Sequence, residues 1–574
     1  MAPLNLIGKP TPLVDGPVKV TGSAEYVADI RIPGILEGKV LRSPHAHARI
    51  LNIDVEKARR APGVYAVITA ADTPDQDWGV TDLKDQPILA RDKVRYVGEE
   101  VAAVAAEDEA VAFEALELIS IEYEPLPAVF DPEEAMSEGA SLVHDVARNI
   151  ADRQAVLRGD MEAALQEADV VYEETYSTPL SYQAYMEPIG SVAVPGGNGK
   201  FTLYSPLQLI FNSRDLIAGV LGIKPENLRV IQPFVGGGFG GKSNEDPNAF
   251  ITMVLAMKTN RPMRVINSRA EEFQAARPRV PTRVWLRMSA RKDGTFLSKE
   301  SRVVADNGAY TGLAKGIMHT ALYRAENLYR IQNIRSEGFL VYTNKIPTGA
   351  FRGFGNPQGT FAQESTIDAL AHELGLDPAE MRLKNALQAG DISIHGWRIG
   401  SCGLKEAIQS CAQAMDWESK RRHRGNERFR CGIGMACAIH VSGNRLQLDW
   451  EGARAYVDLD AEGRVTVRSA EGDIGQGART IAAIIAAEEF DVGLDRVHVG
   501  ETTTEDTPNT LGAFASRLVL IAGHAVRNAV ADAKKQLLPI AAEKLEASTD
   551  DLVWQDGAFQ IRGTPGRSIS LEEV

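Results

Sequence analysis

Residues 235–243 read VGGGFGGKS, and this stretch decides how the rest of the chain is interpreted. Five of the six positions from 236 to 241 are glycine, so the backbone can adopt positive φ angles. Its N–H groups can then approach an anion or an oxo ligand closely. An apolar, strand-like run, residues 227–235, leads into the stretch. The sequence therefore predicts a ligand-binding loop that follows a β-strand.

The same stretch satisfies the pattern GxxxxGKS, the phosphate loop of nucleotide hydrolases. A phosphate loop opens directly into a helix, whereas here Pro247 delays the expected helix to about residue 249. The nearest imitation of a magnesium-binding strand, residues 455–458, has a charged, hairpin-like context. A nucleotide hydrolase using Lys242 and Ser243 thus remains an alternative, as does a loop that is only structural.

Three further segments share the character of this loop. They read GAFRGFGNPQ (residues 349–358), GDIGQG (residues 472–477) and NTLGAFASR (residues 509–517). Glycine-rich segments of this kind suit neither a helix nor a strand interior. The third runs into a predicted helix, and small residues at a helix N-terminus form an anion site. Four such loops from distant parts of one chain indicate a large, phosphate-bearing cofactor held mainly by backbone amides.

Helical and strand-like periodicities alternate along the chain, which predicts the α+β class. We expect domains at residues 1–127, 151–400 and 401–574, with a Pro-, Gly- and acid-rich linker at residues 128–150. The last domain is expected to be incomplete. The clearest predicted helices are residues 107–118, 213–221, 360–374, 379–387, 479–490 and 516–545, and the clearest strands are residues 35–41, 51–55, 119–124 and 283–288.

Composition excludes several classes of protein. The chain has 574 residues and a formal net charge of −15, so it is not expected to seek nucleic acid or anionic membranes. It has neither a signal-peptide core nor the roughly 20 consecutive apolar residues of a membrane span, and we expect a cytoplasmic protein. The four cysteines form no CxxC pair, which argues against iron–sulfur or zinc sites. Free and mostly buried thiols are expected.

Taken together, the four loops resemble, in order and spacing, the molybdenum subunits of the xanthine oxidase family. That family includes xanthine dehydrogenase, aldehyde oxidoreductase, carbon monoxide dehydrogenase and 4-hydroxybenzoyl-CoA reductase. LRSPHAHARI (residues 41–50) is similar to its N-terminal α/β hammerhead domain. The resemblance implies mixed α/β molybdopterin-binding domains after the hammerhead. It also implies molybdenum held by a pterin dithiolene, in the cytosine dinucleotide form, without protein metal ligands.

The resemblance further implies a reaction and partners. The expected reaction is oxidation of an N-heterocycle, aldehyde or aromatic compound with water-derived oxygen. The reverse-sense alternative is reductive dehydroxylation of an aromatic acyl-CoA. Because the chain lacks iron–sulfur motifs and a flavin domain, these cofactors are expected on an iron–sulfur subunit and an FAD subunit.

Site residues follow from the resemblance by position. Gln208 matches the glutamine that hydrogen-bonds the molybdenum oxo group, and Phe239 and Arg352 match residues whose backbone lies beside the metal. Phe354 matches an aromatic residue that stacks on a planar substrate, and His319 and His440 are further candidates for substrate contact. The remaining predicted cofactor-binding residues are Gly238, Gly240, Gln476, Gly477, Ala513, Ala515, Ser516 and Arg517.

The sequence also departs from the family pattern. Purine-oxidising members carry an arginine where His319 and Thr320 stand and a glutamate where Ser243 stands, so purine oxidation is doubtful. No cysteine occurs in residues 351–355, which argues against carbon monoxide oxidation. The family's catalytic glutamate, in a C-terminal GxGE-like motif, has no match here.

Ser570 and Glu573 have the spacing of a capping box, which predicts a helix that continues beyond the chain. We therefore expect either a truncated chain or a second molybdopterin-binding chain that supplies the remainder.

Overall fold

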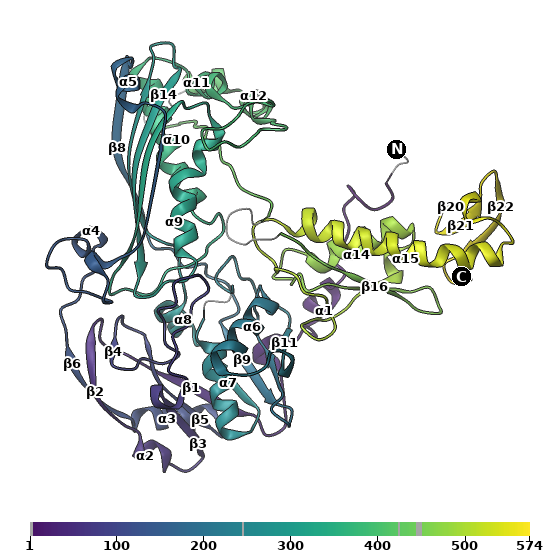
Figure 1. Ribbon diagram of the computed structural model, residues 1–574, viewed down its shortest axis with the longest axis horizontal. Helices are drawn as coiled ribbons and strands as arrows, with labels where there is room; N and C mark the ends of the chain where they lie inside the picture. The colour runs from purple at the N-terminus through teal and green to yellow at the C-terminus, as the bar shows by residue number, and fades with distance from the viewer. Residues whose placement is uncertain (1–3, 244–245, 423–424, 427, 444–450) are drawn as a thin grey trace.

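The largest sheet joins segments from three distant parts of the sequence (Figure 1). The computed structural model describes residues 4–243, 246–422, 425–426, 428–443 and 451–574. In spatial order the eight strands are β19 (Thr502–Thr503), β11 (Leu228–Gln232), β10 (Phe201–Tyr204), β9 (Gly190–Pro195), β12 (Met263–Ile266), β1 (Leu36–Arg42), β5 (Glu100–Ala106) and β3 (Val64–Thr69). β1 pairs in parallel with β12, so the N-terminal region and the middle of the chain share one sheet.

Helices α3 (Glu109–Glu117), α6 (Ile210–Leu221) and α7 (Asn248–Thr259) pack on this sheet. Strand β5 is buried along its whole length, as expected for an apolar strand covered on both faces. A small side sheet, β4 (Lys93–Val94), β2 (Ala48–Asp54) and β6 (Ser120–Pro125), completes the N-terminal region. The predicted helix at 107–118 and the predicted strands at 35–41, 51–55 and 119–124 are confirmed within three residues at each end.

A second, five-stranded sheet lies above the first in Figure 1. Its order is β7 (Ile150–Arg158), β15 (Asn333–Tyr342), β14 (Phe296–Gly308), β13 (Thr282–Ala290) and β8 (Val170–Thr178). Helices α9 (Ala314–Tyr323) and α10 (Asn356–Glu373) pack on it, and α11 (Pro378–Asn385) follows α10. Figure 1 shows α9 and α10 running along the sheet. Gly355, which directly precedes α10, lies against Thr320 and Ala321 of α9.

The predicted linker contains a short helix, α4 (Pro132–Ala135), and packs against the second sheet. Val129, Met136 and Val143 are buried in one cluster with Val304 and Val341. The predicted linker therefore shares a small hydrophobic core with the second sheet.

The C-terminal region forms a separate body that projects to one side (Figure 1). It contains the sheet β16 (Tyr456–Leu459), β17 (Val465–Arg468) and β18 (Val497–Val499), helix α14 (Ala478–Phe490), helix α15 (Gly523–Lys544), and a terminal sheet of β20 (Leu552–Gln555), β21 (Ala558–Ile561) and β22 (Thr564–Ser570). The predicted helix at 516–545 is divided: a π-helical turn, Leu518–Ala522, precedes α15. After β22 the N–H of Ser570 donates to the Glu573 carboxylate at 2.8 Å, and residues 571–573 form a turn.

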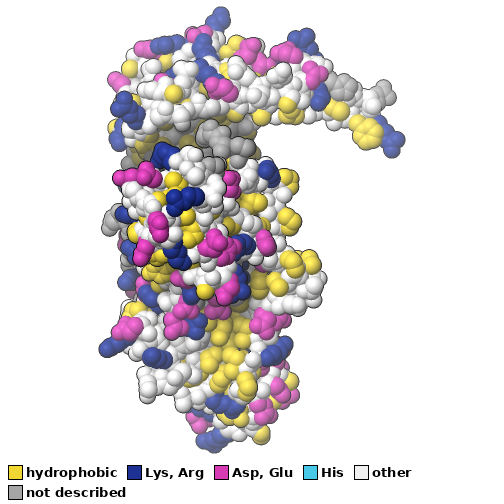
Figure 2. Space-filling model, turned by 90° about the vertical axis from the view of Figure 1, so that its right-hand side faces the viewer, with side chains coloured by type: hydrophobic (Ala, Val, Ile, Leu, Met, Phe, Trp, Pro, Cys, Tyr) yellow, Lys and Arg dark blue, Asp and Glu magenta, His cyan; other side chains and the backbone are white. Residues whose placement is uncertain are grey.

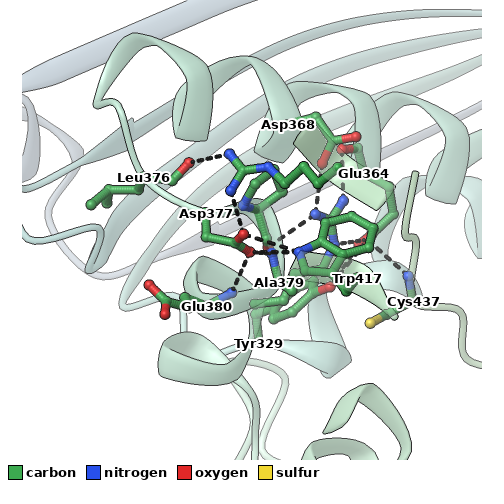
Figure 3. Close-up of polar contacts among 12 residues, drawn as sticks. Tyr329, Glu364, Asp368, Leu376, Asp377, Ala379, Glu380, Trp417 and Cys437 are labelled. Atoms are coloured by element: carbon green, nitrogen blue, oxygen red, sulfur yellow. Dashed lines mark hydrogen bonds and ion pairs between the residues drawn. The ribbon is translucent and has the colours of Figure 1, made fainter. Parts of the chain in front are cut away.

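Residues between the second sheet and this body are fastened to α10 and α11 by buried polar groups (Figure 3). Helix α12 (Leu404–Ala414) is followed by α13 (Trp417–Arg422), whose Trp417 indole N–H donates to the Asp377 carboxylate at 3.0 Å. The Glu364 carboxylate accepts from the Tyr329 hydroxyl at 2.9 Å and from the Cys437 N–H at 2.9 Å. The segment around Cys437 is thereby held along one face of α10.

The four cysteines are free, as predicted, but the expectation that most are buried is wrong. Cys437 is buried, whereas Cys411 and Cys431 are exposed. Cys411 lies on α12, which buries only Ile408. No helix in the described part of the chain is long and apolar enough to cross a membrane. On the face shown in Figure 2, acidic and basic side chains are interspersed.

The remaining short helices are α1 (Gly16–Val20), α2 (Glu56–Arg59), α5 (Met161–Gln166) and α8 (Arg269–Ala275).

Candidate cofactor site

The glycine loop, residues 235–243, begins three residues after β11 ends. Phe239 has a φ of 53° and Gly240 a φ of 103°, both in the left-handed region. A Cβ atom at Gly240 would lie 2.8 Å from the Ala350 carbonyl oxygen, a contact that no larger residue could make without displacing the backbone. Glycine is therefore required here both for conformation and for close approach.

Gln208 connects this loop with the segment 509–517. Its side chain is buried, with its residue 3% exposed. The carboxamide oxygen accepts from the Gly240 N–H at 3.2 Å, and the carboxamide nitrogen donates to the Ala513 carbonyl at 2.8 Å. The Ala513 N–H donates to the Gln208 carbonyl at 3.0 Å. Two segments more than 270 positions apart in the sequence thus meet at one side chain.

Residues 349–355 lie directly against the glycine loop. The Arg352 N–H donates to the Phe239 carbonyl at 2.9 Å. The Arg352 side chain is exposed, and its carbonyl accepts from Arg279 at 2.9 Å. Phe354 is half-buried, with a φ of 46°. The backbone of Arg352, and not its guanidinium, therefore makes the contact with the glycine loop.

The loop 472–477 approaches the carboxyl end of β11 through Gln232. A Cβ atom at Gly472 would lie 2.2 Å from the Gln232 side-chain nitrogen, which itself donates to the Leu207 carbonyl at 2.6 Å. Asp473 accepts from the Gly475 N–H at 2.8 Å and from the Gly477 N–H at 3.4 Å. This loop is therefore next to the residue that precedes Gln208.

Gln476 itself is exposed, and its carboxamide folds back on its own loop. The oxygen accepts from the Ile474 N–H at 2.7 Å, and the nitrogen donates to the Gly472 carbonyl at 3.0 Å. Its second amide hydrogen and the exposed position leave it able to contact a ligand.

The segment 509–517 offers its backbone, and not the charge of Arg517, to the candidate site. Ala515 and Ser516 have φ angles of 46° and 50°. Arg517 is fully buried and is ion-paired with Glu471 and with Glu451, the latter at 2.8 Å. The Arg517 guanidinium is therefore engaged within the protein, whereas the strained backbone before it remains at the site.

Lys242 turns away from the loop that precedes it. Its ammonium group is buried and donates to the Glu187 carboxylate at 2.6 Å. The same carboxylate oxygen accepts from the Gly236 N–H at 2.8 Å. Helix α7 begins only at Asn248. A phosphate-loop lysine must reach its nucleotide, so this geometry does not favour a nucleotide hydrolase.

The two histidines differ in their relation to the site. The His319 Nε2 lies 2.8 Å from the Asp152 carboxylate on β7. His440 Nδ1 lies 3.0 Å from the Asn356 side chain, which donates to the Gly353 carbonyl at 2.7 Å. The structure thus brings His440, but not the His319 ring, to the loop that contains Phe354. Residues 244–245, which follow Ser243, lie outside the described residues.

Sequence reasoning missed two buried braces of the glycine loop, Gln183 and Glu187. The Gln183 nitrogen donates to the Ala350 carbonyl at 2.7 Å, and its oxygen has no partner within the described structure. Glu187 holds both ends of the loop through Gly236 and Lys242. A carboxylate inside the apolar run YMEPIG, residues 185–190, was the available signal for Glu187.

Three family models match the chain. The aldehyde oxidase and xanthine dehydrogenase a/b hammerhead domain matches residues 21–127, and molybdopterin cofactor-binding domains match residues 143–386 and 410–574. The xanthine dehydrogenase molybdenum-binding subunit of Escherichia coli O157:H7 is 35% identical over 98% of this chain and 76% of its own length. The chain belongs to the xanthine dehydrogenase family of molybdopterin-binding subunits. The predicted α+β fold, with its hammerhead domain, is confirmed.

Two other relatives of this molybdopterin-binding subunit are informative. The nicotinate dehydrogenase large molybdopterin subunit of Eubacterium barkeri is 34% identical over 72% of this chain and 99% of its own length. The crystal structure of quinoline 2-oxidoreductase from Pseudomonas putida 86 superposes with a TM-score of 0.93 at 30% identity, covering all of this chain and 76% of that one. The protein is thus an oxidoreductase of the molybdenum hydroxylase type that binds molybdopterin and molybdenum.

The described residues fit a pterin cofactor. A Cβ atom would fill the cradle at Gly240, and one at Gly238 would lie 2.9 Å from the Gln208 carboxamide oxygen. Gln208 also keeps one amide hydrogen beyond its bond to Ala513. Among the described residues no group of three or more His, Cys, Asp or Glu side chains could hold a metal ion. The site therefore offers backbone donors and amides, which suit a cofactor that carries its own metal ligands.

Proposed function

We propose that this subunit holds molybdopterin in its cytosine dinucleotide form and hydroxylates a small planar heteroaromatic compound or aldehyde. The observation that carries the proposal is the meeting of four sequence-distant segments. Three of them contact Gln208 or Gln232, and residues 349–355 contact the glycine loop at Phe239 and Gly240. Main-chain amides held in fixed positive-φ conformations stabilise a polyanionic ligand without a reorganisation cost.

Each predicted residue has a role in this proposal. The backbone of Gly238, Phe239, Gly240 and Arg352 approaches the metal end of the cofactor, where Gln208 donates its remaining amide hydrogen. Gln476 and Gly477 contact the pterin, and the backbone of Ala513, Ala515 and Ser516 holds the phosphate end. Arg517 supports that end indirectly, because its guanidinium is paired with Glu471. The bound cofactor supplies the redox chemistry, with oxygen derived from water.

Substrate contacts are assigned to Phe354 and His440. Burial and the nearby charge of Arg324 lower the pKa of His440, so this ring is neutral near pH 7. A neutral imidazole and a phenyl ring both suit stacking against a planar substrate. His319 is the weaker candidate because it is hydrogen-bonded to Asp152.

The partners that we propose are an iron–sulfur subunit, which receives the electrons, and an FAD subunit. A further molybdopterin-binding chain would supply the segment that carries the family's catalytic glutamate. The relatives include proteins named for xanthine, nicotinate and quinoline. We favour N-heterocycles other than purines as the substrate class because Thr320 and Ser243 stand where purine-oxidising members carry arginine and glutamate.

The test is turnover by the complete holoenzyme purified with its partner subunits. A panel of pyridines, quinolines, aldehydes and purines is assayed for substrate-dependent reduction of a dye, in water enriched in ¹⁸O. We expect ¹⁸O in a hydroxylated heterocycle or in a carboxylate formed from an aldehyde. Loss of a hydroxyl group from an aromatic acyl-CoA in the presence of a strong reductant, without any oxidative turnover, would instead support the reverse-sense reaction.

A further inference from the structure

Arg324 is a buried arginine without an acidic partner. It directly follows Tyr323, the last residue of α9, and it is 6% exposed. Its Nε atom is fully buried and has no hydrogen-bond partner. Its guanidinium makes no ion pair or hydrogen bond with the residues that the structure describes. Burial consequently lowers the pKa of Arg324.

Three other arginines with little exposed surface are paired with carboxylates, and the buried Arg277 donates to the Gln86 side chain. Arg42 pairs with Glu100 at 2.6 Å, Arg382 with Glu364 at 2.7 Å, and Arg517 with Glu451 at 2.8 Å. An unpaired charge removed from water is strongly unfavourable unless a partner is supplied. Arg324 therefore differs from these structural arginines in a way that points to an anion from outside the described chain.

Arg324 lies on the face of α9 that packs against the predicted substrate loop. Thr320 and Arg324, four residues apart, share one face of the helix. A Cβ atom at Gly355 would lie 3.0 Å from the Thr320 Cβ, and one at Gly359 would lie 2.3 Å from the Ala321 carbonyl oxygen. This face thus meets the loop that contains Phe354 and the first turn of α10.

Further unsatisfied polar atoms gather at the same junction. The Asn356 side-chain oxygen and the Thr360 hydroxyl are buried and have no partner within the described structure. They share one face of α10 with Glu364, along which the segment 437–440 runs, because Cys437 bonds to Glu364 and His440 to Asn356. Burial and the charge of Arg324 both lower the pKa of His440.

We propose that Arg324 binds the carboxylate of a planar aromatic or heteroaromatic substrate, so that the substrate class is anionic. The proposal rests on the proposed function, since it assigns one end of that substrate site. A guanidinium offers two parallel N–H donors to a carboxylate, which orients a flat molecule as well as attracting it. The loop 472–477 and the phosphate-binding segment 509–517 approach Gln232 and Gln208, whereas α9 contacts the loop that contains Phe354. A substrate anion, and not the cofactor phosphate, is therefore the expected partner.

The test is calorimetric binding of nicotinate and nicotinamide to the molybdenum-loaded holoenzyme. These two probes differ in charge but hardly in shape. The wild type is expected to bind nicotinate more tightly, and Arg324→Gln is expected to weaken nicotinate binding roughly 30-fold while nicotinamide binding stays unchanged. Arg324→Lys should recover part of the affinity for nicotinate, because it restores the positive charge but not the two parallel N–H donors.

The matched control is Arg330→Gln, which removes an arginine paired with Asp391 at 2.9 Å just after α9 and should leave both affinities unchanged. Equal weakening for nicotinate and nicotinamide in Arg324→Gln, or no charge preference in the wild type, would overturn the proposal. Binding by free inorganic phosphate in competition with nicotinate would instead assign Arg324 to a phosphate and also overturn it. Molybdenum content, measured on the same samples, tests the proposed function separately, since loss of the metal and loss of nicotinate preference are independent readouts.

Discussion

The glycine loop and the α9–α10 junction are neighbouring parts of one site, yet their polar groups are treated in opposite ways. Around the glycine loop the principal polar side chains bond to the backbone: Gln208 bridges two segments, and Glu187 holds both ends of the loop, while the Gln183 oxygen has no described partner. At the α9–α10 junction Arg324, Asn356 and Thr360 keep buried atoms without partners. The difference teaches that a permanently bound cofactor is held by preorganised backbone donors. A substrate that exchanges is bound by side chains whose polar atoms stay unpaired until it arrives.

The largest effect is expected from Gly240→Val, which changes the glycine loop. A valine there would need a φ of 103° and would overlap the Ala350 carbonyl, so the loop must open. We expect the molybdenum content to fall at least about tenfold, measured by elemental analysis of purified protein.

The control is Gly219→Ala, inside α6, where a Cβ atom meets nothing within 4 Å. It should retain full molybdenum content and stabilise the helix by about 1 kcal/mol. Retention of molybdenum by Gly240→Val would show that the backbone of the glycine loop does not hold the cofactor.

Next in size is the buried ion pair beneath the glycine loop. Glu187→Gln leaves the Lys242 ammonium buried and uncompensated, with 1% of its side chain exposed. We expect a loss of about 3–5 kcal/mol in unfolding free energy, read from denaturant midpoints.

The double variant Glu187→Gln/Lys242→Met should lose less than the single variant, because it removes both charges. If the double variant were the less stable one, Glu187 would not act through Lys242.

At the α9–α10 junction we expect a substitution to increase the free energy of unfolding. Arg324→Met removes a buried charge that has no described partner, so the unfolding free energy should rise by about 1 kcal/mol. Thermal unfolding of the variant and wild type, without substrate, measures this. A loss of stability would show that Arg324 is a structural residue.

The smallest effect concerns pH. Because the pKa of His440 is lowered in the folded protein, the unfolded chain binds a proton more readily, and stability is lost as the pH falls below about 6.5. Arg324→Met removes the second cause of that shift, so its stability should fall less steeply with decreasing pH, by less than about 1 kcal/mol. Unfolding midpoints at pH 7.5 and 5.5 test this, with His440→Gln as the variant that cannot titrate.

Elements with a clear local pattern could be predicted from the sequence. The helices at 107–118, 360–374 and 479–490 correspond to α3, α10 and α14, because amphipathic spacing and caps are local signals. The pairing of β1 with β12 could not be predicted, because a single sequence contains no signal that residues 36 and 263 are neighbours in space. That pairing merges the predicted first and second domains into one sheet.

The site shows the same division. The glycine segments could be found because glycine marks backbone that no other residue permits. Glu187 was missed because Lys242 fits the phosphate-loop pattern, which gave that lysine a different partner. Arg324 lacks a hydrogen-bond partner only because of how α9 and α10 pack together, so no sequence pattern could predict it.

Metal and nucleotide analysis of the purified wild-type protein tests the central claim most directly. If four sequence-distant loops hold a molybdenum pterin dinucleotide through their backbones, acid treatment should release CMP in an amount equal to the molybdenum, close to one of each per chain. Protein that is folded, yet contains neither molybdenum nor a pterin after expression with an adequate molybdenum supply, would contradict the account.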